Sequence, residues 1–169
     1  MISHGDNCNP EDAMLELAVM SAAFALGAAI PDRYACSNHS PPLAWSEVPA
    51  NTQSIAILCD DPDAPGGDWV HWVLFNLAPE VQELSENVAR RAPLPGGALQ
   101  GLNDFGRVGY DGPCPPPGRP HRYYFKVYAL DTRLDLDAQA CKPDLLRAMQ
   151  GHILAAGALI GTHARSSAR

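Results

Sequence analysis

Two apolar runs lie close together near the middle of the chain, and each has the length of a buried β-strand. The first covers residues 54–59 (Ser-Ile-Ala-Ile-Leu-Cys) and the second covers residues 72–77 (Trp-Val-Leu-Phe-Asn-Leu). Short apolar runs bounded by turn-forming residues are typical of strands. A third run, residues 121–130, is rich in Tyr, Phe and Val, which also predicts a strand. Because side chains alternate along a strand, His121 and Tyr123 are expected on one face of it.

The N-terminal part gives a divided signal. Residues 1–12 are polar, which predicts a flexible N-terminus. Residues 13–29 are rich in Ala, Leu and Met, so local propensity alone favours a helix. Leu15, Leu17 and Val19 also alternate at the spacing of a strand, so the pattern leaves both alternatives open.

One helix is predicted near the C-terminus. Pro143 suits the first turn of a helix, and Asp144 adds a favourable charge at the helix N-terminus. Apolar residues follow at helical spacing as far as Gly157, which is expected to end the helix, and residues 158–162 are expected to form a short strand. Many strands, long loops and a single late helix predict one β-rich α+β domain over residues 13–169.

Charge and size narrow the function classes. The 169 residues suffice for one domain, and the formal net charge is −7 at pH 7. A nucleic-acid partner is not expected, because a phosphate backbone requires a basic face. The apolar segment 13–30 contains Glu16 and follows no basic residue, so neither a signal peptide nor stable membrane insertion is expected. A cytoplasmic protein is the resulting prediction.

The cysteines are widely scattered and odd in number. They are Cys8, Cys36, Cys59, Cys114 and Cys141. No pair has the Cys-x-x-Cys spacing of a metal or redox motif, and the pattern favours reduced thiols over a disulfide scaffold.

The segment with the densest charge, residues 60–72, lies between the first two predicted strands (Asp-Asp-Pro-Asp-Ala-Pro-Gly-Gly-Asp-Trp-Val-His-Trp). Histidines and carboxylates fix each other's tautomer and charge, and two imidazoles in a pocket would bind a phosphate or carboxylate. The alternative is a turn whose carboxylates cap backbone N–H groups. Asp60 and Asp68 are expected to be turn and solvent-facing charges. The candidate site consists of Asp61, Asp63, His71, His121 and Tyr123.

The same residue types also occur in two other kinds of site. Asp and His suit zinc or non-haem iron, but the spacing of these residues matches no metal motif. A hydrolase would use His71 or His121 as general base with an aspartate orienting it. No Gly-x-Ser-x-Gly elbow is present, and Cys114 lies between prolines without an evident base. We therefore expect no enzymatic activity, no cofactor and no metal.

Several blocks occur together in an order that resembles the phosphatidylethanolamine-binding protein family, in its bacterial branch similar to Raf kinase inhibitor protein. The two main blocks are residues 60–72 and residues 118–125 (Gly-Arg-Pro-His-Arg-Tyr-Tyr-Phe). Residues 40–45, 101–106, 109–116 and 148–154 also match, and the resemblance covers about residues 18–163.

The resemblance implies an antiparallel β-sandwich-like fold with a central sheet, peripheral helices and long pocket-forming loops, and a strand at residues 14–26. It also implies a small pocket for phosphate groups of phospholipid headgroups, nucleotides or phosphorylated side chains. In this sequence the pocket residues would be Asp61, Asp63, Pro65, Trp69, His71, Gly112, Pro115, His121 and Tyr123. The long C-terminal helix that borders the pocket in animal relatives has no counterpart, which leaves the mouth open or completed by a partner in a homodimer.

The expected function is non-enzymatic binding of a small phosphate or carboxylate anion, free or carried by a phosphorylated protein. His71 and His121 are the expected donors, and Tyr123 adds a hydroxyl. Asp61 and Asp63 are expected to hold the two histidines in orientation. A regulator that resembles kinase or protease inhibitors, with a binding surface outside the pocket, is left open.

Overall fold

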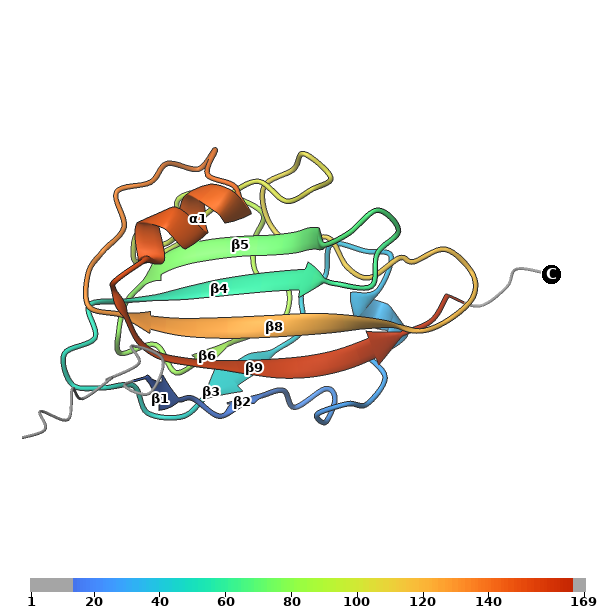
Figure 1. Cartoon of the computed structure of the whole chain (residues 1–169), viewed down its shortest axis with the longest axis horizontal. Coiled ribbons are helices and arrows are strands. Elements are labelled where there is room, and N and C mark those ends of the chain that lie inside the picture. The colour runs from blue at the N-terminus through green and yellow to red at the C-terminus, as the bar shows by residue number, and fades with distance from the viewer. Residues whose placement is uncertain (1–13, 166–169) are drawn as a thin grey trace, which may run out of the picture.

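The computed structural model describes residues 14–165, which form strands and one α-helix (Figure 1). The mainly β fold class is therefore confirmed, while the prediction for residues 1–12 falls outside the described residues. The elements in chain order are β1 (Leu15–Glu16), β2 (Val19–Met20), the 3-10 helix η2 (Asp32–Tyr34), β3 (Leu43–Trp45), β4 (Ser54–Asp61), β5 (Trp69–Leu77), β6 (Glu83–Leu84), β7 (Leu99–Gln100), β8 (His121–Leu130), α1 (Lys142–Met149) and β9 (Ile153–His163).

Two sheets face each other. The larger one has six strands in the order β1-β9-β8-β4-β5-β7, and the smaller one has three strands in the order β2-β3-β6. All pairs are antiparallel except β1 with β9, which is parallel. Helix α1 covers the opposite side of the larger sheet, beside β5 (Figure 1).

The central strand β4 is buried on both faces, which explains its unbroken apolar sequence. Ile55, Ile57 and Cys59 belong to the core between the two sheets. Ala56 and Leu58 belong to a second core between the larger sheet and α1. Strands buried on both faces lose the polar alternation of half-exposed strands.

Strand β8 has the two faces that its sequence predicted. Tyr123, Phe125 and Val127 are buried, whereas Arg122 is exposed and Lys126 is partly exposed. The predicted strands at residues 54–59 and 72–77 are also confirmed, and both extend further toward the charged segment than their apolar residues suggested.

The helix favoured by propensity at residues 13–29 is wrong. The segment contains the two-residue strands β1 and β2, so the single strand that the resemblance implied over residues 14–26 is confirmed only in part. It is held by β9, because the Leu17 N–H donates to the carbonyl oxygen of Ala156 at 2.9 Å. A Cβ on Gly157 would lie 1.9 Å from the Leu17 carbonyl oxygen, so glycine allows this close approach. Tertiary pairing overrides helix propensity here.

The C-terminal prediction is correct at its start and wrong at its end. Pro143 lies in the first turn of α1, and the Asp144 carboxylate accepts the Cys141 N–H at 3.0 Å, which caps the helix. The helix ends at Met149 rather than at Gly157. The following residues form β9, which pairs with β8 along most of its length. No helix among residues 14–165 is long and apolar enough to cross a membrane.

Candidate functional site

Three neighbouring strands bring the candidate residues to one end of the larger sheet. β4 ends at Asp61, His71 lies near the start of β5, and β8 begins at His121 (Figure 1). Asp61 and Tyr123 lie on the face that turns away from α1 and line the same cavity. The site is therefore built on strands, with the β4–β5 connection and the segment before β8 as its rim.

The cavity has a volume of about 270 Å³. This lies just below the range of roughly 300–1,000 Å³ that is usual for drug-sized ligands, so a small chemical group fits it better than a whole lipid. All the expected residues except Asp63 and Gly112 line it. The lining residues are Asp61, Ala64, Pro65, Trp69, His71, Phe105, Cys114, Pro115, Pro116, His121 and Tyr123.

A buried carboxylate orients one of the two histidines. The Nδ1–H of His121 donates to Oδ2 of Asp61 at 2.7 Å, and Asp61 is 3% exposed. The other carboxylate oxygen accepts the backbone N–H of Asp63 at 2.8 Å. Because Nδ1 is engaged, the Nε2 atom of His121 is left for a ligand, and it donates a hydrogen bond when the ring is protonated.

The second histidine is held by a backbone carbonyl. Nδ1 of His71 lies 2.6 Å from the carbonyl oxygen of Asp111, which can only accept, so Nδ1 carries the proton. Burial lowers the pKa of His71 and favours the neutral ring. The Nε2 atom of the neutral ring is an acceptor. The expectation that both histidines act as donors is therefore corrected for His71.

Aromatic rings fix the rest of the site. The ring of His71 packs edge-on against Tyr123 and Phe105, with centroid distances of 5.3 and 5.6 Å. Burial, assisted by the charge of Asp61, raises the pKa of Tyr123, so its hydroxyl stays protonated and can donate. Phe105 also meets Trp69 edge to face at 5.4 Å, and these two partly exposed rings form the apolar rim.

Asp63 lies outside the cavity lining and does not contact a histidine. Its Oδ2 accepts hydrogen bonds from the backbone N–H and the Nε of Arg122, each at 2.9 Å, and its Oδ1 accepts from Nη2 at 2.9 Å. These bonds lower the pKa of Asp63 to about 2. Asp63 therefore ties the β4–β5 connection to β8, and the role expected for it in orienting histidines is corrected.

The prediction that Asp60 faces solvent is also wrong. Asp60 is 2% exposed and accepts hydrogen bonds from Nζ of Lys126 at 2.9 Å and from Nζ of Lys142 at 2.8 Å. β4 continues to Asp61, so consecutive side chains point to opposite faces of the sheet. Asp60 consequently lies on the α1 side.

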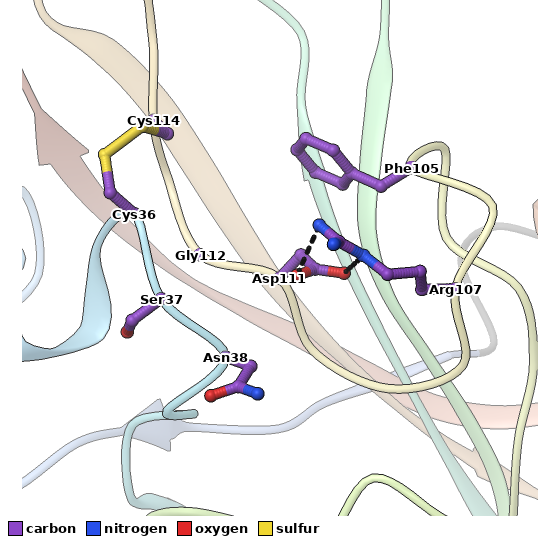
Figure 2. A pocket seen from close by; sticks show the side chains of 8 residues that line it. All are labelled: Cys36, Ser37, Asn38, Phe105, Arg107, Asp111, Gly112 and Cys114. Carbon is purple, nitrogen blue, oxygen red and sulfur yellow. Dashed lines mark hydrogen bonds and ion pairs between the residues drawn. A yellow bond between two sulfur atoms is a disulfide. The ribbon is translucent and has the colours of Figure 1, made fainter.

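Gly112 borders a neighbouring cavity of about 440 Å³ (Figure 2). A Cβ at this position would lie 2.2 Å from the carbonyl oxygen of Tyr34, so only glycine lets the two backbones meet. The cavity shares Phe105 and Cys114 with the candidate site. Its lining residues are Cys36, Ser37, Asn38, Phe105, Arg107, Asp111, Gly112 and Cys114.

Asp111 was not identified from the sequence, although its carbonyl sets the tautomer of His71. Its carboxylate contacts Arg90 at 3.1 Å and Arg107 at 3.0 Å, and accepts from Nδ2 of Asn103 at 2.7 Å. Hydrogen bonds from Arg90 and Asn103 outweigh the effect of burial and lower the pKa of Asp111. The sequence around Asp111 does not indicate its contact with His71, because the two residues are 40 positions apart and meet only when the long loop folds back onto β5.

The expectation of reduced thiols is wrong for two cysteines. Cys36 and Cys114 form a disulfide with an S–S distance of 2.06 Å across a separation of 78 residues. Cys59 is buried and free, and Cys141 is partly buried and free. Cys114 also lines the candidate cavity, as do Ala64, Phe105 and Pro116, which the sequence analysis did not select. Residues 14–165 contain no group of three or more His, Cys, Asp or Glu side chains suited to a metal.

Comparisons with known proteins agree with this architecture. The family model described as phosphatidylethanolamine-binding protein matches residues 20–164. A UPF0098 protein of Methanothermobacter thermautotrophicus is 54% identical over 138 residues, which is 80% of this chain and 91% of that protein.

Two solved structures share the fold over nearly their whole length. YbcL of Escherichia coli, described as a member of the mammalian PEBP family, has a TM-score of 0.83 and 35% identity, covering 89% of this chain and 99% of YbcL. The PEBP homolog CT736 of Chlamydia trachomatis has a TM-score of 0.81 and 40% identity with the same coverage. The chain therefore belongs to the phosphatidylethanolamine-binding protein family.

Proposed function

We propose that this chain is a non-enzymatic protein that binds a phosphate group in the cavity formed by β4, β5 and β8, which we call the phosphate pocket. The observation that carries the proposal is that His71, His121 and Tyr123 line one small cavity while Nδ1 of each histidine is already engaged. We assign the ligand contacts to three atoms: Nε2 of His121, the hydroxyl of Tyr123 and Nε2 of His71. The hydrogen bonds at Nδ1 orient both histidine rings before a ligand arrives.

The protonation states select the form of phosphate. Nε2 of His121, when its ring is protonated, and the hydroxyl of Tyr123 would donate to phosphate oxygens. Neutral His71 accepts a hydrogen bond, which a phosphate oxygen supplies only when it is itself protonated. The pocket is therefore suited to a singly charged phosphate or phosphate monoester, and a fully deprotonated anion would leave Nε2 of His71 facing a lone pair.

The walls support the same conclusion. Pro115 and Pro116 have no N–H groups, so this side of the pocket offers no backbone donor to the anion. Discrimination is left to the three side-chain atoms. The exposed rings of Trp69 and Phe105 provide an apolar surface for the part of the ligand that carries the phosphate, whether a headgroup or a phosphorylated side chain.

Histidine ring signals followed by NMR test this proposal. The protein is titrated at pH 6 with inorganic phosphate, phosphoethanolamine and sulfate. We expect the phosphates to shift the rings of His71 and His121 at millimolar concentration, and sulfate, which cannot donate to His71, to bind about tenfold more weakly. His121→Asn should abolish the response, and His152→Asn, which alters an exposed pair with Asp131 elsewhere, is the matched control. Absence of a phosphate-induced shift at both rings would reject the proposal.

A hydrolase is the second candidate, and the 2.7 Å contact between Asp61 and His121 favours it, because a carboxylate that orients a histidine is a common general-base arrangement. The lining of the pocket contains neither Ser nor Thr, and the sulfur of Cys114 is bonded to Cys36. Turnover of a chromogenic phosphate ester or carboxylate ester that His121→Asn abolishes would establish this alternative instead.

We keep a cytoplasmic location as a proposal, and the disulfide makes an oxidising compartment its alternative. We also propose a phosphorylated protein as a partner. Its binding would use the phosphate pocket and the rim formed by Trp69 and Phe105.

A further inference from the structure

The Cys36–Cys114 disulfide lies at the boundary between the phosphate pocket and the neighbouring cavity. Cys114 lines both, and Cys36 lines the second one (Figure 2). Both cysteines are exposed to solvent, unlike a disulfide in a protein core. An exposed disulfide is accessible to an attacking thiolate, which is the requirement for thiol–disulfide exchange.

Hydrogen bonds join the two segments only on one side of the disulfide. The Cys36 N–H donates to the carbonyl oxygen of Pro113 at 2.8 Å, and the Gly112 N–H donates to that of Ser37 at 2.7 Å. The hydroxyl of Tyr110 donates to the carbonyl oxygen of Tyr34 at 2.8 Å. All three bonds lie before Cys114 in the loop, so they would persist without the disulfide.

The loop beyond Cys114 depends on the disulfide far more. Within the described part of the chain, residues 115–120 make no hydrogen bond outside the strand ladder that starts at His121. Pro115 is nevertheless buried and forms a wall of the phosphate pocket. The disulfide is thus the last cross-link that holds this wall before β8 begins.

The backbone of Cys36 provides a second observation. Its φ is +47°, in the left-handed region that residues other than glycine rarely adopt. Its N–H bond and the disulfide both hold it there. Cleavage of the disulfide removes one of these two restraints, so the backbone at Cys36 gains freedom together with the loop.

We infer that the Cys36–Cys114 disulfide is a site of thiol–disulfide exchange with a dithiol reductant, and that its reduction weakens ligand binding in the phosphate pocket. The regulatory part of the inference rests on the proposed function. The reacting class is a dithiol, because the second thiol completes the reaction within the same molecule.

The exchange transfers two electrons from the dithiol to the disulfide. One thiolate of the dithiol attacks the sulfur of either cysteine, the S–S bond breaks, and the other cysteine leaves as a thiolate that takes up a proton. The second thiol of the reagent, as thiolate, then attacks the mixed disulfide and releases the remaining cysteine. Cys36 and Cys114 are reduced to thiols, and the dithiol is oxidised to a cyclic disulfide.

Reduction lowers affinity by reducing the fraction of molecules whose pocket is complete. The apparent dissociation constant equals the intrinsic constant divided by the competent fraction. If Pro115 stays in place about one fifth of the time, the dissociation constant for phosphate rises about fivefold. The polar atoms of His71, His121 and Tyr123 belong to strands, so they remain in position and binding is weakened rather than lost.

The test compares the oxidised full chain with the same protein treated with dithiothreitol, a dithiol without an anionic group that would compete for the pocket. Inorganic phosphate is titrated by calorimetry at pH 6.5, and mass spectrometry after alkylation counts the thiols. We expect two additional thiols and an approximately fivefold weaker affinity, both reversed on reoxidation. The Cys36→Ser/Cys114→Ser variant should bind like the reduced protein and ignore dithiothreitol, and Cys141→Ser should respond like the parent.

The outcomes separate the two proposals. Equal phosphate affinity before and after verified reduction overturns this inference and leaves the phosphate pocket intact. A disulfide that resists dithiothreitol in the folded protein overturns the exchange site itself. Oxidised protein that shows no phosphate binding overturns both proposals. If the double serine variant does not fold, as judged by circular dichroism, the comparison on the parent protein still decides.

Discussion

Asp60 and Asp61 are consecutive, almost equally buried and different in chemistry. Asp60 accepts bonds from two lysine ammonium groups on the α1 side of the sheet, at 2.9 and 2.8 Å. Asp61 accepts bonds from one histidine and one backbone N–H on the other side, beside a cavity. Both lysines line a cavity of about 320 Å³ on the α1 side, and Lys142 also contacts Asp68. His121 instead lines the phosphate pocket, with only its Nδ1 engaged by Asp61. The two carboxylates therefore differ in the partner they hold: two ammonium groups that form ion pairs with Asp60, and one imidazole that Asp61 orients.

The largest expected effect concerns the lysine side of this comparison. Replacement of both lysines by methionine (Lys126→Met/Lys142→Met) leaves the carboxylate of Asp60 buried without a partner. We expect the free energy of unfolding in urea at pH 7 to fall by about 3–5 kcal/mol. Lys126→Met alone is the control, because Lys142 still neutralises the carboxylate. A loss below about 1 kcal/mol in the double variant would show that water or another group satisfies Asp60.

Asp61→Asn tests the opposite side. Asparagine keeps the shape but removes the carboxylate that accepts the Nδ1–H of His121 and orients its ring, so we expect the dissociation constant for phosphate to rise about ten- to hundredfold, or about 1.4–2.8 kcal/mol. Calorimetry at pH 6.5 measures it. Asp68→Asn, an exposed charge outside the pocket lining, is the matched control. Tighter binding of phosphate by Asp61→Asn would show that the carboxylate chiefly repels the anion. The role assigned to Asp61 in orienting His121 for binding would then be wrong.

The pH dependence of binding sharpens the roles of the histidines. A phosphate monoester loses its second proton with a pKa near 6, so the singly charged form falls from about half at pH 6 to about one hundredth at pH 8. Since burial lowers the pKa of His71 and keeps its Nε2 an acceptor, we expect affinity for phosphoethanolamine to fall at least about tenfold from pH 6 to pH 8. A titration series over this range measures it. Stronger binding at pH 8 would mean that the dianion is the ligand.

Asp63→Asn should have the smallest effect, because its partner Arg122 is on the surface. The pKa of Asp63 is lowered to about 2, so its contribution to stability is complete above the unfolded pKa of about 3.9 and is lost as the pH falls through 2. Urea midpoints measured from pH 5 to pH 2 should therefore fall less steeply in Asp63→Asn than in the parent. Phosphate affinity at pH 6.5 should be nearly unchanged. A large loss of phosphate affinity in this variant would show that Asp63 takes part in binding.

The sequence predicted the elements whose pattern is local. The strands around β4, β5 and β8 follow from apolar runs and alternation, and the start of α1 follows from Pro143 and Asp144. Residues 13–29 and the residues after α1 were harder to assign from the sequence. Both segments are rich in alanine, and their patterns fit a helix as well as a strand. Gly157, taken for the end of a helix, is the position that lets the backbone of Leu17 reach β9. Such a requirement exists only once two distant segments meet.

The same reasoning applies to the candidate site. Asp61, His71, His121 and Tyr123 were selected for their residue types and their places beside strands, and the structure brings all four to one cavity. Asp60 was misplaced, because β4 was expected to end at Cys59 and the alternation of faces was not continued. The disulfide and the contact between Asp111 and His71 could not be predicted, since each depends on how a long loop folds back onto the body.

The proline-lined wall of the pocket has a consequence for how specificity could change. Anion sites at helix N-termini bind through backbone amides, which side-chain exchanges other than those to proline leave in place. Here Pro115 and Pro116 contribute none, and our proposal assigns recognition to side chains on adjacent strands. Single exchanges at these positions can therefore shift preference among oxyanions while the sheet stays unchanged. The arrangement makes ligand preference an evolvable property on a rigid scaffold.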